Sequence, residues 1–402
     1  MHDDDRWFGR FREVPVAVSA GVLVNAVFTG LVTVTLPLEL AGQGASKGQI
    51  AAFFIIGALT AATLVLTVGP VVRRIGVPRW SLTLCAVVSA GGLVVVAAGG
   101  PAWRLHPAAA LVMTMSLTYP LYVAVASNLA GASAARIVAV LRTIFVAGYL
   151  GGLGVFSLAA AAEQAFGPVA APIRWAIGLA LGAALVAQLP RPAAAGGAAA
   201  ADGSAAAGAA RTTKLVVLAA ALAVLLMRAA DSLRQVYLPL YALGEDIPQP
   251  LISTLFAVTV AVEVLVLAPL SSISDRFGSR WTLLGVCVTG VLSFATVALG
   301  GGYPMLVFSQ ALYAVFAAGF QSIGMVLLGD SLRSGLSGGA GAYTAVIQVG
   351  ATVGIVAPLV VPGYSVAVFW IAVLFCLGAA ALLLADPLLR GRRRRPAHDH
   401  AH

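Results

Sequence analysis

Charged residues are scarce in this chain. Asp, Glu, Lys and Arg make up only 10% of its 402 residues, whereas apolar residues make up 60%. Soluble domains carry roughly a quarter of their residues as charged side chains. Mean hydropathy is correspondingly high, at +0.98. This composition excludes a soluble globular protein and predicts a chain that crosses a lipid bilayer many times.

Cysteine and histidine are rare as well. The three cysteines, Cys85, Cys287 and Cys376, fall inside apolar stretches without the spacing of a zinc site or a loop disulfide, so we expect them to be packing residues. All five histidines lie outside these stretches. No nucleophile with a base and an orienting group is evident, and no phosphate-binding loop of the Gly-Lys-Ser type occurs. The sequence therefore disfavours an enzyme and indicates neither a metal site nor a cofactor.

Twelve apolar stretches are long enough to span a membrane, since about 20 residues of helix cross its hydrocarbon core. They predict an all-α membrane protein with twelve transmembrane helices. The expected spans are 14–40, 47–72, 80–100, 107–131, 137–162, 168–190, 214–242, 250–274, 281–300, 304–329, 338–361 and 364–385.

The basic residues predict the orientation of these spans. If the amino terminus is cytoplasmic, 18 of the 24 Lys and Arg fall inside, three on outer loops or helix ends, and three within spans. Short loops rich in Lys and Arg resist translocation. We therefore expect a multi-pass protein of the cell (plasma) membrane with both termini in the cytoplasm. The net charge of +9 is mostly this topology signal and indicates no nucleic-acid partner.

The chain repeats itself at an offset of 202 residues. Leu36-Pro37-Leu38 recurs as Leu238-Pro239-Leu240, and Gly148 recurs as Gly350. Parallel repeats of six helices build one large class of transporters. The sequence predicts two pseudo-symmetric bundles, residues 1–190 and 214–402, the second ending in a basic cytoplasmic tail. Residues 191–213 are rich in Ala and Gly and predict a flexible cytoplasmic linker that lets the bundles rock about a central cavity.

A basic loop follows the eighth span and reads Ser274-Asp275-Arg276-Phe277-Gly278-Ser279-Arg280-Trp281. It resembles the loop signature of the major facilitator superfamily, Asp-Arg-x-Gly-x-Arg. The resemblance implies the fold of that superfamily and a cytoplasmic-loop gate formed by Asp275, Arg276, Gly278 and Arg280. The first-half counterpart keeps Gly76, a following Arg and a Trp, but has Arg73 in place of the acid.

Further segments resemble the sugar efflux branch of that superfamily. They include Asp231-Ser232-Leu233, Glu263, Leu141-Arg142 and the stretch from Ser322 to Asp330. The resemblance implies export of sugars or glycoside-like molecules in exchange for protons. Arg228, Arg234 and Gln235 depart from that branch, where these positions are mostly neutral, so the substrate class of this chain can differ.

Charges within the membrane cost several kcal/mol unless they are paired or hydrated. Arg228, Asp231 and Arg234 are spaced three residues apart, so they share one broad helix face and can form local ion pairs. Glu263 lies at a similar depth in the next span. Two further charges, Glu39 and Arg142, lie nearer the ends of their spans.

We interpret Glu263, with Asp231, as proton-coupling acids. A carboxyl group in the membrane can bind and release a proton when a neighbouring arginine moves. The alternative is equally compatible with the sequence: a static ion pair from Glu263 to Arg228 or Arg234 that only joins two helices.

Polar and aromatic residues in the cavity-forming spans are candidates for substrate binding, because a hydroxylated ligand needs hydrogen-bonding groups and flat apolar faces. They are Asn25, Tyr122, Asn128, Arg142, Arg228, Arg234, Gln235, Tyr313, Gln321 and Gln348.

The sequence as a whole predicts a secondary active transporter that works by alternating access. We expect a monomer that binds a small sugar-like or drug-like substrate, protons and the lipid bilayer. The favoured function is proton-coupled export of sugars or sugar-like polar molecules. Two alternatives stay open: a proton-coupled drug exporter, and a non-transporting membrane sensor with the same fold.

Overall fold

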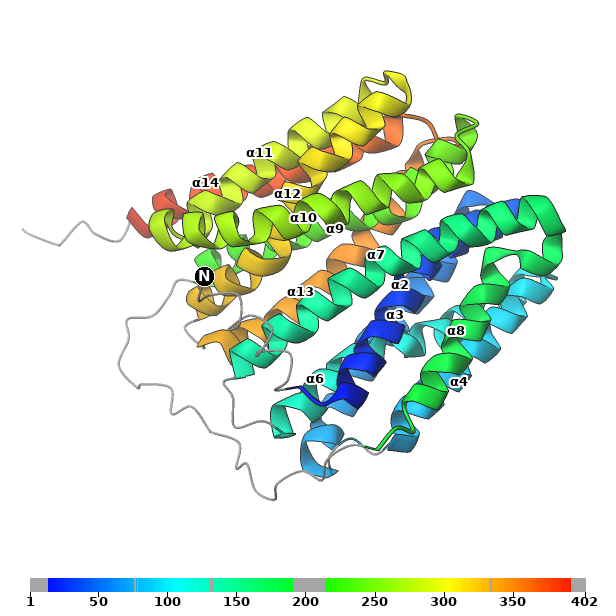
Figure 1. The fold of residues 1–402 in the computed structure, drawn as a ribbon. Helices are drawn as coiled ribbons and strands as arrows, with labels where there is room; N and C mark the ends of the chain where they lie inside the picture. The colour runs from blue at the N-terminus through cyan, green and yellow to red at the C-terminus, as the bar shows by residue number, and fades with distance from the viewer. Residues whose placement is uncertain are drawn as a thin grey trace, which may run out of the picture. The chain divides into compact units, whose positions relative to one another are not determined.

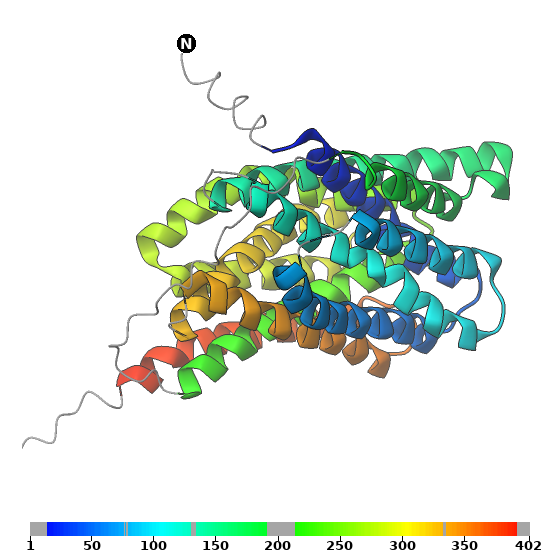
Figure 2. The same cartoon turned by 90° about the horizontal axis from the view of Figure 1, so that it is seen from below.

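The protein is described by a computed structural model that covers residues 14–75, 77, 79–129, 134–190, 214–332 and 335–391. Helices dominate these ranges and run along one another, as two views show (Figures 1 and 2). Among the described residues, 11 helices are long and apolar enough to cross a membrane, and a shorter apolar helix spans Val346–Val360. These elements confirm the predicted all-α membrane fold.

The first half of the chain supplies the first six predicted spans. Its elements are α2 (Val16–Gly42), α3 (Lys47–Ile75), α4 (Arg79–Ala98), η1 (Ala102–Arg104), α5 (Leu105–Val112), η2 (Met113–Leu117), α6 (Thr118–Leu129), α7 (Ala134–Phe166), η3 (Pro168–Ala170) and α8 (Pro172–Val186).

The second half supplies the other six. Its elements are α9 (Lys214–Gly244), α10 (Gln249–Phe277), α11 (Ser279–Ala298), α12 (Gly302–Leu332), α13 (Gly335–Val356), η4 (Ala357–Val360) and α14 (Ala367–Gly391).

The fourth span differs from the single helix predicted over 107–131, because it is interrupted by the 3-10 segment η2. Pro120 has no N–H to donate to the carbonyl one turn earlier, which weakens the α-helix at this point. The hydroxyls of Thr114, Ser116 and Thr118 each donate to the carbonyl three residues before them, at 2.6–2.7 Å. Such local bonds compete with the regular α-helical ladder and favour the tighter turn.

The repeat at an offset of 202 residues is confirmed by the helices themselves. α3 and α10 begin and end 202 residues apart. The turn before each of them contains a left-handed residue at the same offset, Gly44 with φ 77° and Asp246 with φ 55°. Asp is one of the few residues with a Cβ that adopts this conformation readily. The two halves thus share one local backbone geometry.

Glycines bring the first and fifth helices of each half into backbone contact. A Cβ added at Gly152 of α7 would lie 2.1 Å from the carbonyl oxygen of Val27 in α2. A Cβ added at Gly354 of α13 would lie 2.0 Å from the carbonyl oxygen of Ala229 in α9. Both the glycines and the carbonyls are 202 residues apart. Small residues allow this approach in the absence of water.

Contacts divide the chain into two compact units. The first contains Met1–Asp202 with Pro239–Ala257, and the second contains Gly203–Leu238 with Val258–His402. In the first unit α2 packs on α7 and α8, and α4 packs on α5 and α8. In the second unit α11 packs on α12 and α14, and α12 packs on α13. The predicted bundle limits, with a linker over 191–213, remain a prediction, and that linker lies outside the described residues.

Candidate functional site

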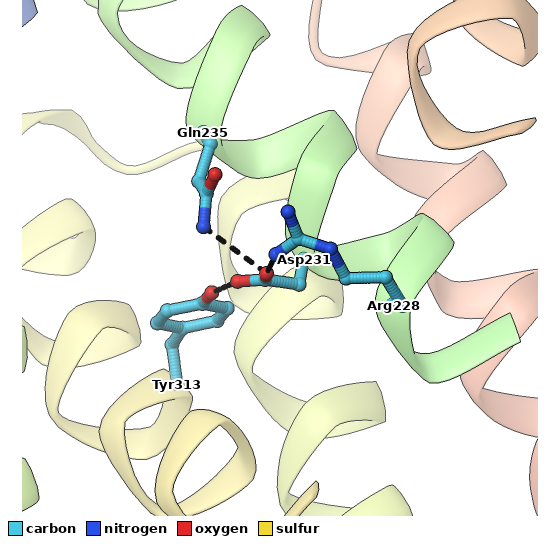
Figure 3. A network of polar contacts seen from close by, with 4 residues as sticks. All are labelled: Arg228, Asp231, Gln235 and Tyr313. Carbon is cyan, nitrogen blue, oxygen red and sulfur yellow. Dashed lines mark hydrogen bonds and ion pairs between the residues drawn. The ribbon is translucent and has the colours of Figure 1, made fainter. Parts of the chain in front are cut away.

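Asp231 lies near the middle of α9, and its side chain is fully buried in the second unit. Its Oδ1 accepts a hydrogen bond from the Tyr313 hydroxyl of α12. Its Oδ2 accepts one from Arg228, which forms the predicted local ion pair, and one from Gln235 Nε2 at 3.1 Å. Figure 3 shows the carboxylate between these three donors. The donors compensate a charge that would otherwise be costly in a membrane.

Arg234 forms a second polar group one turn further along α9, and only 4% of it is exposed. Its Nε and Nη2 donate to Oε1 of Gln310 at 2.7 and 2.5 Å, and Nη2 also donates to Oγ1 of Thr259 at 2.8 Å. Gln310 is on α12 and Thr259 is on α10. A single guanidinium therefore connects three helices of the second unit.

Tyr313 joins the two polar groups. Its hydroxyl donates to Asp231, and the guanidinium carbon of Arg234 lies 4.0 Å from its ring centroid. Edge-on contacts fix the ring on its other sides, with Phe294 at 5.9 Å and Phe316 at 5.8 Å between centroids. Cation–π contacts strengthen when they are desolvated, as this one is. Movement of either charged residue should therefore be felt by the other.

Glu263 lies on α10, and 7% of it is exposed. It follows Thr259 by four residues, so both project from the same face of the helix. Thr259 is itself a partner of Arg234. Glu263 therefore lies next to the position where α10 meets the polar cluster, as the sequence predicts. Its assignment as a proton carrier or as a structural partner stays open.

The charges of this cluster balance when all its members are ionised. Arg228 and Arg234 carry two positive charges, and Asp231 and Glu263 carry two negative charges. Burial of an unbalanced charge in an apolar region is strongly unfavourable. Addition or removal of one proton in this cluster would therefore be a large perturbation that motion or a ligand has to offset.

The candidates in the first unit form a separate and uncharged set. Asn25 of α2 is buried, and its Oδ1 accepts a hydrogen bond from Thr118 Oγ1 at 2.6 Å. Tyr122 of α6 is also buried, and its ring covers the space beside Gly21. The repeat places Thr29 of α2 opposite Asp231 in register. The ionised centre is thus a feature of the second half alone.

Four remaining candidates lie at the edges of the described structure. Arg142 of α7, Gln321 of α12 and Gln348 of α13 are each half-buried. Asn128 belongs to α6, but its side chain lies outside the described residues. Among these, Arg142 and Asn128 belong to the first unit and so are not part of the Asp231 cluster.

Two members of the cluster, Gln310 and Thr259, are absent from the sequence-based candidates. Each stands at helical spacing from a residue that the sequence does single out. Gln310 precedes Tyr313 by three residues, and Thr259 precedes Glu263 by four. Polar residues one turn from a membrane-embedded charge share its helix face, and this spacing is the signal that identifies them.

The loop between α10 and α11 is shaped by Gly278, whose φ of 85° favours glycine. Arg280 donates from Nε to the carbonyl of Leu383 at 2.6 Å and from Nη2 to the carbonyl of Leu384 at 3.3 Å, which ties α11 to α14. Asp275 and Arg276 are exposed. Gly76, the predicted counterpart in the first half, lies outside the described residues.

Metal ligands are not gathered in the described part of the chain. No group of three or more His, Cys, Asp or Glu there is placed to hold a metal ion. The polar cluster instead offers guanidinium, carboxylate, amide and phenol groups, which bind polar organic molecules through hydrogen bonds.

Comparison with known sequences relates the second half of the chain to a transporter family. Residues 220–401 match the family model of the Major Facilitator Superfamily. This match covers all the described members of the Asp231 cluster. No curated protein is significantly similar to the chain over its sequence.

Comparison with solved structures covers almost the whole chain. The nucleoside transporter NupG is 16% identical, with a TM-score of 0.74 over 93% of this chain and 98% of that chain. A bacterial homologue of the iron transporter ferroportin, in its inward-facing state, is 14% identical, with a TM-score of 0.67 over 92% and 97%. A bacterial homologue of the human lysosomal transporter Spinster, inward-facing and unoccupied, is 12% identical, with a TM-score of 0.63 over 95% and 98%. The chain therefore has the twelve-helix major facilitator fold that the sequence predicts.

Proposed function

We propose that the protein is a secondary active transporter that exports a sugar or a sugar-like polar molecule in exchange for protons. The observation that carries this proposal is the buried cluster around Asp231, which keeps two arginines and two carboxyl groups within a membrane-embedded helix bundle. A membrane protein retains such costly groups where a polar molecule or ion has to pass.

The accessible edge of the cluster is suited to hydroxyl groups. Asp231 and Arg234 are almost completely buried, whereas the Arg228 side chain is 23% exposed and Gln235 is half-buried. Arg228 and Gln235 both donate to the same carboxylate oxygen. A sugar hydroxyl can accept from these donors and donate to the carboxylate, so it can replace one contact without leaving a charge unsatisfied.

Nucleosides fit the same reasoning, because a nucleoside carries a sugar with free hydroxyl groups. The similarity in fold to a nucleoside transporter adds them to the sugar-like molecules that deserve a test. The base of a nucleoside would also need an aromatic or apolar surface. Sugars, glycosides and nucleosides therefore form one panel of candidate substrates.

We assign different roles to the two carboxyl groups. Asp231 accepts hydrogen bonds from three donors, which favours its ionised form and suits a fixed counter-charge. Glu263 lies on α10, one turn from the Thr259 that contacts Arg234. A movement of Arg234 changes the field at Glu263, and this supports Glu263 as the residue that binds and releases the proton.

Flux measurements in proteoliposomes test these assignments. Wild-type protein should exchange a labelled member of the panel for its unlabelled form, and an imposed pH gradient should drive net accumulation. Glu263→Gln should retain exchange but lose the effect of the gradient. Glu245→Gln is the matched control, because Glu245 is an exposed acid just beyond the end of α9.

The outcomes separate the alternatives. Undiminished pH-driven accumulation by Glu263→Gln would remove Glu263 from the coupling mechanism and support the static ion pair. Flux of drug-like cations, with none of the panel, would support the drug exporter. No flux by wild-type protein with any of these compounds would contradict the proposed transport and support a sensor.

A further inference from the structure

An apolar groove of about 570 Å³ runs along the second unit between α10, α11 and α12. Phe277 of α10 and Trp281 of α11 line one end of it, and both are more than half exposed. Ile273, Gly285 and Thr289 line its length. Large apolar side chains at this exposure mark a surface that another apolar molecule covers.

The dimensions of the groove match a lipid chain. From Trp281 to Thr289 the wall follows two turns of α11, about 12 Å at 1.5 Å per residue. One leaflet of the hydrocarbon core is about 15 Å thick. Gly285 lies midway along this wall, and a Cβ added there would meet no atom within 4 Å. The missing side chain thus leaves room where an acyl chain would lie.

The end of the groove at the α10–α11 turn is positively charged. The guanidinium of Arg276 lies 5.4 Å from the ring centroid of Phe277, and that of Arg280 lies 5.3 Å from the ring of Trp281. Two arginines and the exposed Asp275 leave a net charge of one positive unit on this turn. Its predicted position is the cytoplasmic face, where membranes present anionic headgroups.

We propose that this groove binds an anionic phospholipid, with one acyl chain along α11 and the phosphate at Arg276 and Arg280. The aromatic rings of Phe277 and Trp281 lie between the charged end and the apolar length, at the level where a lipid changes from headgroup to chain. Arg280 also donates to the carbonyls of Leu383 and Leu384, so a bound lipid would stabilise the contact between α11 and α14.

Thermal unfolding of delipidated protein in detergent tests this site. Phosphatidylglycerol should raise the unfolding midpoint at lower concentrations than phosphatidylcholine with the same chains. Arg276→Gln should weaken the response to phosphatidylglycerol about fivefold, as expected for one basic contact near a headgroup. Gly285→Leu should abolish the response, because its side chain occupies the groove without a clash.

Gly178→Leu is the matched control. Gly178 is exposed on α8 of the other unit, and a Cβ there also meets nothing within 4 Å. This variant should respond to phosphatidylglycerol like the wild type. Equal responses of the wild type to the two lipids, or a full response of Gly285→Leu, would overturn the proposal. So would stabilisation by glycerol phosphate alone, which would indicate a simple anion site. None of these readouts depends on transport.

Discussion

The contact between α2 and α7 leads to a sharp prediction about Gly152. A methyl group at this position would lie 2.1 Å from the carbonyl oxygen of Val27 and 2.9 Å from the backbone nitrogen of Leu31. Non-bonded carbon and oxygen atoms approach to about 3.5 Å, so the helices have to separate by more than about 1 Å. Overpacking of this kind costs roughly 1–3 kcal/mol, and the better helix propensity of alanine returns up to about 1 kcal/mol.

We therefore expect Gly152→Ala to lose about 2 kcal/mol of unfolding free energy. For a unit of this size that lowers the thermal midpoint by roughly 4–8 °C. Intrinsic tryptophan fluorescence during heating reports the transition. Gly154→Ala is the control two residues away on α7, where an added Cβ meets nothing within 4 Å, and it should unfold at the wild-type temperature or above. Equal midpoints for the two variants would refute the close packing of α2 and α7.

Two further substitutions test local features of the second unit. Tyr313→Phe removes a hydroxyl donor from the buried Asp231, so we expect a loss of about 1–3 kcal/mol in unfolding free energy, again measured from the thermal midpoint. A midpoint equal to that of the wild type would mean that this hydrogen bond contributes little. Gly278→Ala forces a residue with a Cβ to adopt φ 85°, which costs about 1–2 kcal/mol, whereas Gly285→Ala on the same unit should not lower the midpoint. Equal effects of these two alanines would contradict the left-handed turn.

The helices were predictable because their apolar length and the repeat are both written in the sequence. Every predicted span corresponds to helical structure, and Gly148 with Gly350 marks the same helix pair in each half. The interruption over Met113–Leu117 was not predicted, because hydropathy does not register hydroxyls that bond to the helix backbone.

The candidate site was predictable only along single helices. Arg228 and Asp231 were expected to pair because residues three apart share a helix face, and they do. The partners of Arg234 were not predicted, because Thr259 and Gln310 lie 25 and 76 residues away on other helices. Which polar residue meets which charge depends on how helices pack, and one sequence does not contain that information.

Direct binding tests most simply whether the Asp231 cluster holds the substrate. Calorimetric titration with whichever sugar or nucleoside gives flux should yield a Kd at least about tenfold weaker for Asp231→Asn than for wild type, because a charged hydrogen-bond acceptor is lost. Glu245→Gln, at an exposed position, should bind like the wild type. An unchanged Kd in folded Asp231→Asn protein would contradict the account.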